Sequence, residues 1–460
     1  MMNRIKAPLT AVATVVVLSG CGLLDVDNPN SLVEESIRQQ AAANGVANGS
    51  LQLVSEAVAD VWEGPAVTAD ELYWIGSRDA WGQLDQGFIS NPENEFTDAA
   101  FPTLGRAVWM AQNAVEILEG HFTEGGADFQ TDYGRALMFR GLILMVTAES
   151  QDDMTFSYKM VDGPPVSSGQ ATIGSEGQLA VPTMVAVMDL AIQSFTDAIT
   201  QFTAQGDADL ITNTRALRAR AYHSRVIMQN RSTAGGALAF PNAVADANAV
   251  LADVGGSDWS FNLSYSSSSS ACGMCGNVND RKENQIDLSL VTVDASNDID
   301  GINLQDPVTG ADDLALIGRL DQWKGGSYLD SGNQYPDLAI VSERLLRMIV
   351  AEDALAGGAG DFATEINAIR DLDDSDAAYD YTPAGDEVAM LQHHRRVNTV
   401  LMGLRLPDMY RWGLAPGADS DPAARWAGGS DAVLRVGSML PITIIEVRAN
   451  CHLNGQGCGG

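Results

Sequence analysis

Positive charge is scarce in this sequence. The 460 residues hold 27 Lys and Arg against 60 Asp and Glu, for a formal net charge of −33, and lysine stands only at positions 6, 159, 282 and 324. A surface this acidic repels the phosphate backbone of nucleic acids. We therefore expect no nucleic-acid partner and attribute the acidity to solubility.

The usual catalytic signatures are also missing. The chain has no Gly-x-Ser-x-Gly elbow, no His-Glu-x-x-His zinc helix and no Gly-x-x-x-x-Gly-Lys-Ser/Thr phosphate loop. Histidine is rare: His223 lies among arginines, and adjacent His393 and His394 point in different directions on a predicted helix. Chance pairs of carboxylates are so frequent that no glycoside-hydrolase pair stands out. We predict that the protein is not an enzyme and needs no cofactor.

No metal site is predicted either. Residues 297–301 resemble half of a calcium loop, but Ser296 and Pro307 stand where an EF-hand needs acidic ligands. The acidic run 371–376 is expected to be solvated.

Long apolar runs are absent except near the N-terminus, where residues 7–18 are too short to span a bilayer. This run follows Arg4 and Lys6 and ends in Leu18-Ser19-Gly20-Cys21, which is typical of a bacterial lipoprotein signal. We predict a signal peptide at 1–20, acyl chains such as palmitate on Cys21, and a lipid-anchored tether at 21–36. The alternative is an ordinary secretory signal with a chance cysteine.

The other four cysteines form two close pairs, Cys272 with Cys275 and Cys451 with Cys458. In an exported protein such pairs favour disulfides. A zinc site that includes His452 is the alternative, although zinc-finger spacing is lacking. We expect no helix to start at Cys272, so a thioredoxin-type reactive thiol is not predicted.

Helical periodicity dominates the rest of the chain. From residue 182 to 202, apolar residues recur at the spacing of one helix face. We predict tetratricopeptide-like helix hairpins and a mainly α fold, with residues 37–460 as a single domain. The predicted helices are 104–122 with 131–150, 182–202 with 214–229, 242–254, and 336–355 with 361–372.

Irregular segments are predicted between these helices, at about 64–102, 152–181, 255–335 and 416–439. Long loops inside a compact domain are usually functional. Flat aromatic rings beside polar groups suit sugars, which have both polar and apolar faces. The alternative is that these rings are buried in small satellite cores. The ligand-binding candidates are Tyr73, Trp74, Arg78, Trp81, Trp259, Trp323 and Tyr328.

Seven blocks of the sequence resemble, in order, motifs of the SusD/RagB family of outer-membrane lipoproteins. Gly403-Leu-Arg-Leu-Pro-Asp-Met-Tyr-Arg-Trp-Gly413 and the closing Leu440-Pro-Ile motif are the most specific. One departure is Asn450-Cys451, where the family has Asn-Pro. The blocks are 24–29, 68–72, 133–141 (with 163–166 after it), 216–226, 363–370, 403–413 and 440–454.

This resemblance implies a SusD-like fold, with a helical scaffold and an inserted loop-rich lobe. It further implies anchoring on the outer face of the outer membrane. Capture of an oligosaccharide, or of a peptide, and delivery to a SusC-like TonB-dependent transporter would be the function. The residues also leave room for a glycan-degrading lipoprotein or a purely structural adaptor.

Overall fold

The computed structural model describes residues 34–157, 162–167, 183–232, 235–330, 332–416 and 425–458. The predicted signal peptide, Cys21 and most of the tether lie outside the described residues, as do Pro182 and parts of the predicted loops 152–181 and 416–439. No helix within the described ranges has both the length and the apolar character needed to cross a membrane.

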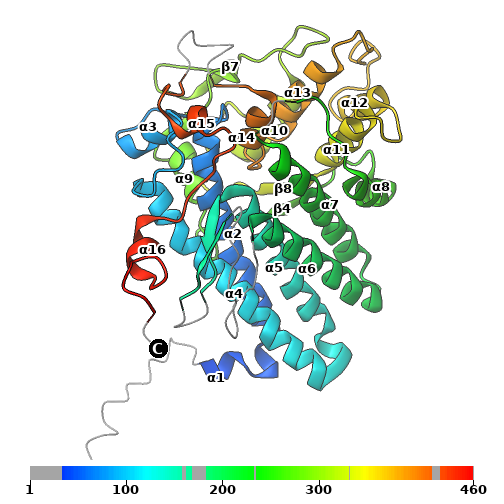
Figure 1. The fold of residues 1–460 in the computed structure, drawn as a ribbon. Coiled ribbons are helices and arrows are strands. Elements are labelled where there is room, and N and C mark those ends of the chain that lie inside the picture. The colour runs from blue at the N-terminus through cyan, green and yellow to red at the C-terminus, as the bar shows by residue number, and fades with distance from the viewer. Residues whose placement is uncertain are drawn as a thin grey trace, which may run out of the picture.

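Long helices stand side by side and form the scaffold of the molecule (Figure 1). They are α2 (Ala43–Thr68), α4 (Glu95–Gly125), α5 (Gln130–Ser150), α6 (Met184–Gln205) and α7 (Ala208–Asn230). Shorter helices complete the scaffold, namely α1 (Glu34–Ile37), α8 (Pro241–Val254), α11 (Glu343–Leu355) and α12 (Phe362–Arg370), with short 3-10 turns η1 (Gln40–Ala42) and η2 (Gly126–Phe129).

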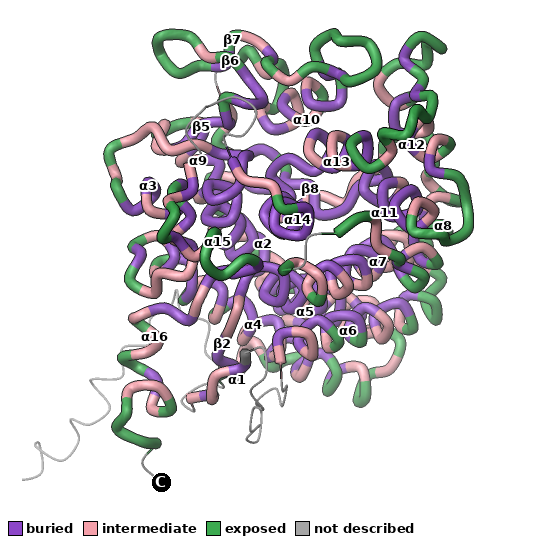
Figure 2. Tube along the Cα trace, turned by 45° about the horizontal axis from the view of Figure 1, so that its top comes forward, coloured by how far each residue is buried: buried purple, intermediate pink, exposed green. Residues whose placement is uncertain are grey.

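Neighbouring scaffold helices pack as pairs. α4 packs against α5, α6 against α7 and α11 against α12, while α8 packs against both α7 and α11. Buried residues follow the inner faces of these helices, and exposed residues follow the outer loops (Figure 2). The predicted mainly helical fold with hairpins is therefore confirmed.

The α6 helix shows how the sequence produces this packing. Its start is capped by the Thr183 hydroxyl, which accepts a hydrogen bond from the Ala186 amide, and it ends at Gly206, whose φ of 72° suits a left-handed C-cap. Phe195 and Phe202 are fully buried against α5. They fit because Gly141 and Gly134 face them: a Cβ there would come within 2.7 Å and 2.6 Å of the two rings.

A loop-rich lobe is inserted between α8 and α11; its strand β7 lies at the top of Figure 1, and its strands β4 and β8 reach into the middle of the molecule. Its short strands pair antiparallel: β1 with β5, β6 with β7, and β4 with β8. This inserted lobe agrees with the predicted architecture. Its elements are β4 (Ser260–Leu263), α9 (Gly273–Asn279), β5 (Asn284–Ile286), β6 (Val291–Val293), β7 (Ile299–Ile302), α10 (Leu314–Lys324) and β8 (Leu338–Ser342), joined by β1 (Leu72–Trp74) from earlier in the chain.

The prediction of a loop over 64–102 is wrong for much of its length. α2 continues through Pro65 to Thr68, α3 spans Asp79–Asp85, and α4 already begins at Glu95. Every residue from 61 to 70 is buried. Burial of apolar side chains thus offsets the cost of about 3 kcal/mol for proline inside a helix.

Two further predictions need correction. The predicted helix 336–355 begins as strand β8, because its five consecutive buried residues pair with β4 before α11 starts. A helix does begin after Cys272, whose sulfur accepts a hydrogen bond from the Cys275 amide at 3.2 Å and caps α9. The predicted irregular segment 255–335 therefore contains α9, α10 and several short strands.

The C-terminal part crosses back over the scaffold. Its elements are α13 (Glu387–Asn398), α14 (Arg405–Trp412), α15 (Asp431–Leu434) and α16 (Ile444–Ala449). The Leu440 amide donates to the Ser150 carbonyl, and the Leu440 carbonyl accepts from the Asp152 amide. This segment thus runs beside the hairpin of β2 (Asp153–Thr155) and β3 (Pro165–Ser167).

Candidate functional site

A buried network of arginines and carboxylates joins the C-terminal helices to the scaffold. Arg220 of α7 makes two hydrogen bonds to Glu149 of α5, at 3.0 and 2.7 Å, and also donates to the Met402 carbonyl at 2.8 Å. Arg411 of α14 bonds Glu352 through both of its terminal nitrogens, at 2.5 and 3.0 Å. Charged groups this deeply buried are stable only when they are paired. These contacts therefore explain why arginine and glutamate stand together at these buried positions.

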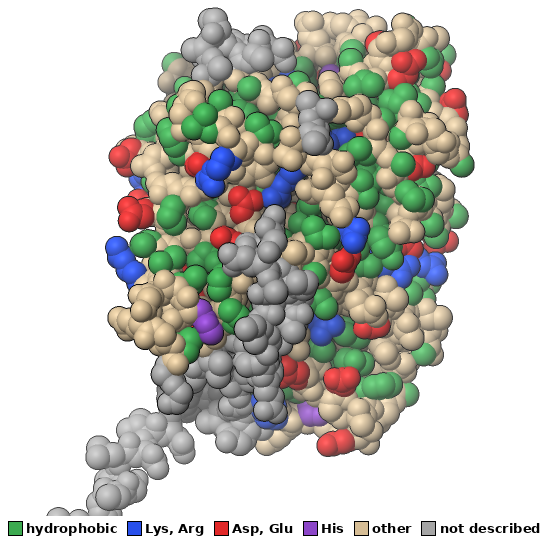
Figure 3. Space-filling model, viewed as in Figure 1, with side chains coloured by type: hydrophobic (Ala, Val, Ile, Leu, Met, Phe, Trp, Pro, Cys, Tyr) green, Lys and Arg blue, Asp and Glu red, His purple; other side chains and the backbone are tan. Residues whose placement is uncertain are grey.

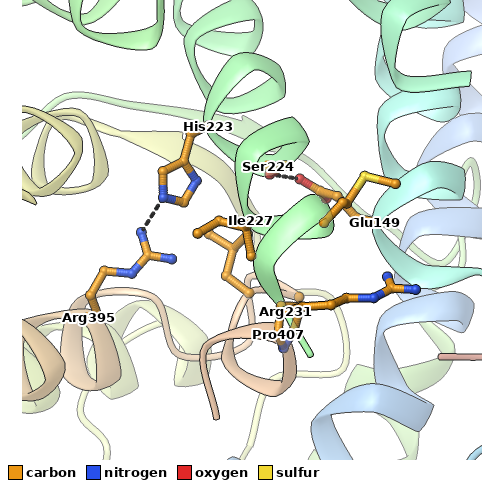
Figure 4. Close-up of a pocket in the computed structure, with 10 residues that line it drawn as sticks. Glu149, His223, Ser224, Ile227, Arg231, Arg395 and Pro407 are labelled. Atoms are coloured by element: carbon orange, nitrogen blue, oxygen red, sulfur yellow. Dashed lines mark hydrogen bonds between the residues drawn. The ribbon is translucent and has the colours of Figure 1, made fainter. Parts of the chain in front are cut away.

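Figure 4 shows the hollow beside this network, with His223 facing Arg395 and Ser224 donating to Glu149. Burial lowers the pKa of His223 well below its usual value, and the surrounding arginines lower it further. Burial alone would raise the pKa of Asp408, but the Arg395 and Arg411 guanidiniums outweigh it and hold that pKa below its usual value. The hollow measures about 10 Å³, enough for a single water, and is too small for a nutrient.

Other blocks that carry the family resemblance make similar contacts. Arg405 binds Asp70 through two hydrogen bonds of 2.5 and 2.8 Å. Arg370 binds Asp306 at 2.7 and 3.1 Å and so ties α12 to the lobe. These contacts give the motif residues a role in stabilising the fold.

The first group of predicted aromatic residues surrounds β1 and α3. The ring of Trp81 is only 2% exposed and stacks on Phe96 with 3.7 Å between ring centroids. The Arg78 guanidinium covers the same Phe96 ring, 4.5 Å from its centroid. Trp74 is partly buried and lies over Gly82, where a Cβ would come within 2.9 Å of its ring.

Burial of these rings was the alternative interpretation, and the structure favours it for two of them: Trp81 belongs to the main hydrophobic core, and Trp74 packs against that core. The buried ring of Trp81 leaves no open face for a ligand in this structure. Tyr73 is partly buried, and the Arg425 guanidinium lies 5.7 Å from its ring centroid.

The second group lies around α10. Trp323 is 5% exposed, and its Nε1 donates to the Asn279 side chain at 3.1 Å, so its ring supports the lobe from within. Tyr328 is partly buried, and its amide donates to Asp321 at 2.6 Å. The Trp259 carbonyl accepts from the Glu343 amide at the start of α11. The structure therefore brings Trp323, Tyr328 and the neighbours of Trp259 to one region.

Two hollows lie along α10 in that region. The larger is an open depression of about 520 Å³, within the range of roughly 300–1,000 Å³ that is typical of ligand sites. The smaller measures about 220 Å³. Gln322 lines both, and we call the pair the α10 groove. The larger hollow is lined by Asp321, Gln322, Gly325, Gly326, Asn333, Tyr335, Pro336 and Asp337, and the smaller by Asp258, Ser260, Ala315, Gly318, Arg319, Gln322, Ser342 and Arg344.

The two hollows carry different charged groups. Asp321 and Asp337 line the larger hollow, whereas Asp258, Arg319 and Arg344 line the smaller one. Burial, followed by the neighbouring Arg344 charge, lowers the pKa of Arg319 to about 10, so Arg319 stays charged at neutral pH. Amides, carboxylates, guanidiniums and a tyrosine together offer hydrogen bonds to a polar ligand.

Most of these groove residues were missed by sequence reasoning. A signal was present, because Ala315, Gly318, Gln322 and Gly325 recur at three- and four-residue spacing on one face of α10. Gly318 has open space at its Cβ position and lines the smaller hollow together with Gln322.

Two clusters in the described ranges have the composition of a metal site, but internal contacts explain both. In the first, Asp306 is bound by Arg370, and Asp313 accepts from His393 at 2.7 Å. In the second, Cys451, His452 and Cys458 lie together. The structure pairs Cys451 with Cys458, and Cys272 with Cys275, as disulfides.

Figure 3 shows how charged and apolar side chains are distributed over one face of the molecule. Acidic, basic and apolar side chains are interspersed over the described part of that face. The half calcium loop at 297–301 covers the end of the turn between β6 and β7 and the first three residues of β7, and Lys282 binds Asp298 there at 2.9 Å.

No protein-family model matches the sequence. No curated protein sequence matches it either. Solved structures do match: a SusD superfamily protein from Bacteroides fragilis superposes with a TM-score of 0.62 at 13% identity, covering 90% of this chain and 98% of the other. The chain has the SusD-like fold. The fold that the sequence resemblance implied is thereby confirmed.

Two other structures with this fold broaden the comparison. A SusD superfamily protein from Bacteroides vulgatus gives a TM-score of 0.60 at 15% identity, covering 90% of this chain and 97% of the other. Surface glycan-binding protein A from Bacteroides thetaiotaomicron, solved in complex with laminarihexaose, gives 0.56 at 13% identity, covering 90% and 98%.

Proposed function

We propose that this SusD-like protein belongs to the SusD/RagB family and captures an oligosaccharide at the cell surface. The observation that carries the proposal is the α10 groove, which presents polar groups from α10 and the following loop on a SusD-like scaffold. Similar structures include a glycan-binding protein in complex with laminarihexaose, which favours a sugar ligand over a peptide.

Delivery to a SusC-like TonB-dependent outer-membrane transporter is the second part of the proposal. The order of the family motifs and the lipoprotein signal ending at Cys21 support it. In this proposal the lipid holds the protein on the outer face of the outer membrane, beside the transporter that receives the ligand.

Binding without covalent chemistry is the third part. The groove lining offers hydrogen-bond donors and acceptors, but its described residues include no histidine or cysteine. The two carboxylates of the larger hollow, Asp321 and Asp337, are proposed to orient sugar hydroxyls.

The test of capture is calorimetric titration of the protein with panels of oligosaccharides and peptides. We expect an oligosaccharide to bind, and Gln322→Ala to weaken binding about five- to tenfold through loss of a hydrogen bond. Gln193→Ala, on the exposed face of α6, is the matched control and is expected to change affinity less than twofold. Binding of peptides alone would instead support the peptide-capturing alternative, and sugar cleavage would support the enzyme.

The test of the partner is affinity capture of the lipoprotein from detergent-solubilised outer membranes. We expect a large TonB-dependent transporter to copurify. Repeated capture of the intact lipoprotein without any such transporter would contradict this part of the proposal.

A further inference from the structure

The larger hollow of the α10 groove is lined by charged groups of one sign. Asp321 and Asp337 line it, and its described lining includes no lysine, arginine or histidine. Asp330 adds a third carboxylate beside the hollow, because its Oδ2 lies 3.0 Å from the position that a Cβ of the lining residue Gly326 would take. A ligand in this hollow therefore meets two carboxylates in the wall and a third close by.

The hydrogen bonds of these carboxylates come from uncharged donors. Asp321 accepts from the Tyr328 amide at 2.6 Å, and Asp330 accepts from the Ser327 amide at 3.0 Å. Asp337 is exposed, and its carboxylate forms neither a hydrogen bond nor an ion pair within the described ranges. Their negative charge thus stays available to act on a ligand.

The lysine nearest to Asp321 along α10 does not neutralise the hollow. Lys324 follows Asp321 by three residues, but it does not belong to the lining. The charged groups close enough to affect Lys324 are Asp298 and Lys282, which belong to other parts of the lobe.

The smaller hollow has no spare positive charge either. Its two arginines are Arg319 and Arg344, and Arg344 is shared by two carboxylates. It binds Asp258 at 2.8 and 3.0 Å and Asp373 at 2.8 Å. Two positive charges are thereby matched by two negative ones, so the charge of the groove as a whole is set by the acidic larger hollow.

We propose that the α10 groove selects uncharged oligosaccharides and excludes those that carry carboxylate or sulfate groups. The inference rests on the proposed function and names the substrate class of the same site. Sugar hydroxyls can donate hydrogen bonds to Asp321 and Asp337, whereas an anionic group over the larger hollow would face charges of its own sign. The formal net charge of −33 acts in the same direction at longer range.

The test uses pairs of trisaccharides that differ at one sugar, which is glucose in one member and glucuronic acid in the other. The acidic sugar is placed at each position in turn, and several linkages are titrated calorimetrically into the full mature protein. For neutral trisaccharides that bind, we expect the acidic member to bind roughly fivefold or more weakly in at least one position. The ratio of the two affinities should shrink as salt is added.

A double variant tests whether the groove itself is responsible. Asp321→Asn/Asp337→Asn should bring the ratio of the two affinities to within about twofold, because it removes both carboxylates from the wall. Asp128→Asn/Asp209→Asn is the matched control: it changes the net charge equally at exposed positions of η2 and α7 and should keep the ratio. Thermal unfolding of each variant checks folding. Asp337→Asn alone changes an exposed side chain and should reduce the ratio in part, so it decides if the double variant does not fold.

The outcomes separate the two proposals. Binding of neutral sugars together with equal or tighter binding of their acidic partners overturns the inference and leaves oligosaccharide capture standing. Binding of no sugar at all overturns oligosaccharide capture, and the inference with it. A ratio that stays unchanged in Asp321→Asn/Asp337→Asn assigns the exclusion to the overall charge of the protein and also overturns the inference.

Discussion

At the scale of single residues, glycines determine how closely two helices can pack, and buried carboxyl groups make stability depend on pH. Gly141 and Gly134 stand where two phenylalanine rings of α6 approach the backbone of α5. Glu63 is a buried acid on α2 that accepts hydrogen bonds from the side chains of Asn277 and Asn284, both at 2.9 Å. Each feature leads to a measurable prediction.

Gly141→Ala is expected to destabilise the protein by about 1–3 kcal/mol, because the new methyl group would overlap the Phe195 ring in a close-packed core. Gly120→Ala is the matched control, since it is exposed in α4 with open space at its Cβ. It should stabilise by about 0.5–1 kcal/mol through helix propensity. Urea unfolding measures both, and equal effects of the two changes would refute the packing argument.

Glu63 makes stability depend on pH. Burial raises the pKa of Glu63 from 4.5 to about 8. Between these two pH values the folded protein keeps the proton on Glu63, whereas the unfolded chain has lost it. The free energy of unfolding should therefore fall as pH rises from about 4.5 to about 8, and then level off. Glu63→Gln should reduce this slope by up to about 1.4 kcal/mol per pH unit.

Urea unfolding between about pH 5 and about pH 8 checks this slope. Glu124→Gln, on an exposed side chain of α4, serves as the control and should leave the slope unchanged. A Glu63→Gln slope identical to that of the unchanged protein would show that Glu63 is ionised in the fold. Burial raises the pKa of Glu71 to about 8 as well, so part of the slope should remain.

At the scale of elements, paired charges connect helices that are far apart in the sequence. Two arginines on α7 allow a direct comparison. The Arg220–Glu149 pair is 0% and 4% exposed, whereas the Arg225–Asp189 pair is 34% and 50% exposed. The first pair holds α7, α5 and the segment before α14 together.

Arg220→Met should cost about 3–5 kcal/mol, because it leaves the buried Glu149 without its partner. Arg225→Met should cost no more than about 1 kcal/mol, because water screens an exposed pair. Chemical denaturation of the two variants measures the difference. Equal losses would mean that the buried network contributes no more than a surface pair.

At the scale of the whole molecule, the proposed anchor decides where the groove operates. Cys21→Ala should move the protein from the membrane fraction to the soluble fraction and abolish palmitate labelling, because the acyl chains supply the membrane affinity. Cell fractionation and uptake of the captured sugar measure the effect. The double variant Cys451→Ser/Cys458→Ser is the control, and membrane retention in Cys21→Ala would contradict the anchor.

Local sequence patterns predicted much of the helical scaffold, although the predicted helices did not include α2. The amphipathic pattern of α6 and the glycine that ends it are local properties, so the helix was predicted to within a few residues. The short strand β8 was not predicted, because five consecutive buried residues have no period that separates strand from helix. The continuation of α2 through Pro65 was missed for a related reason: propensity is local, whereas the burial that overrides it is not.

The choice of polar and aromatic residues that face a ligand depends instead on tertiary contacts. Trp81 and Trp323 belong to the predicted site by composition, yet both are buried by partners such as Phe96 and Asn279 from other segments. The α10 groove combines one face of α10 with residues near β4 and β8, which lie far from α10 in the sequence. A periodic pattern reports on neighbours along the chain, whereas a binding site depends on contacts between distant segments, which form only when the chain folds.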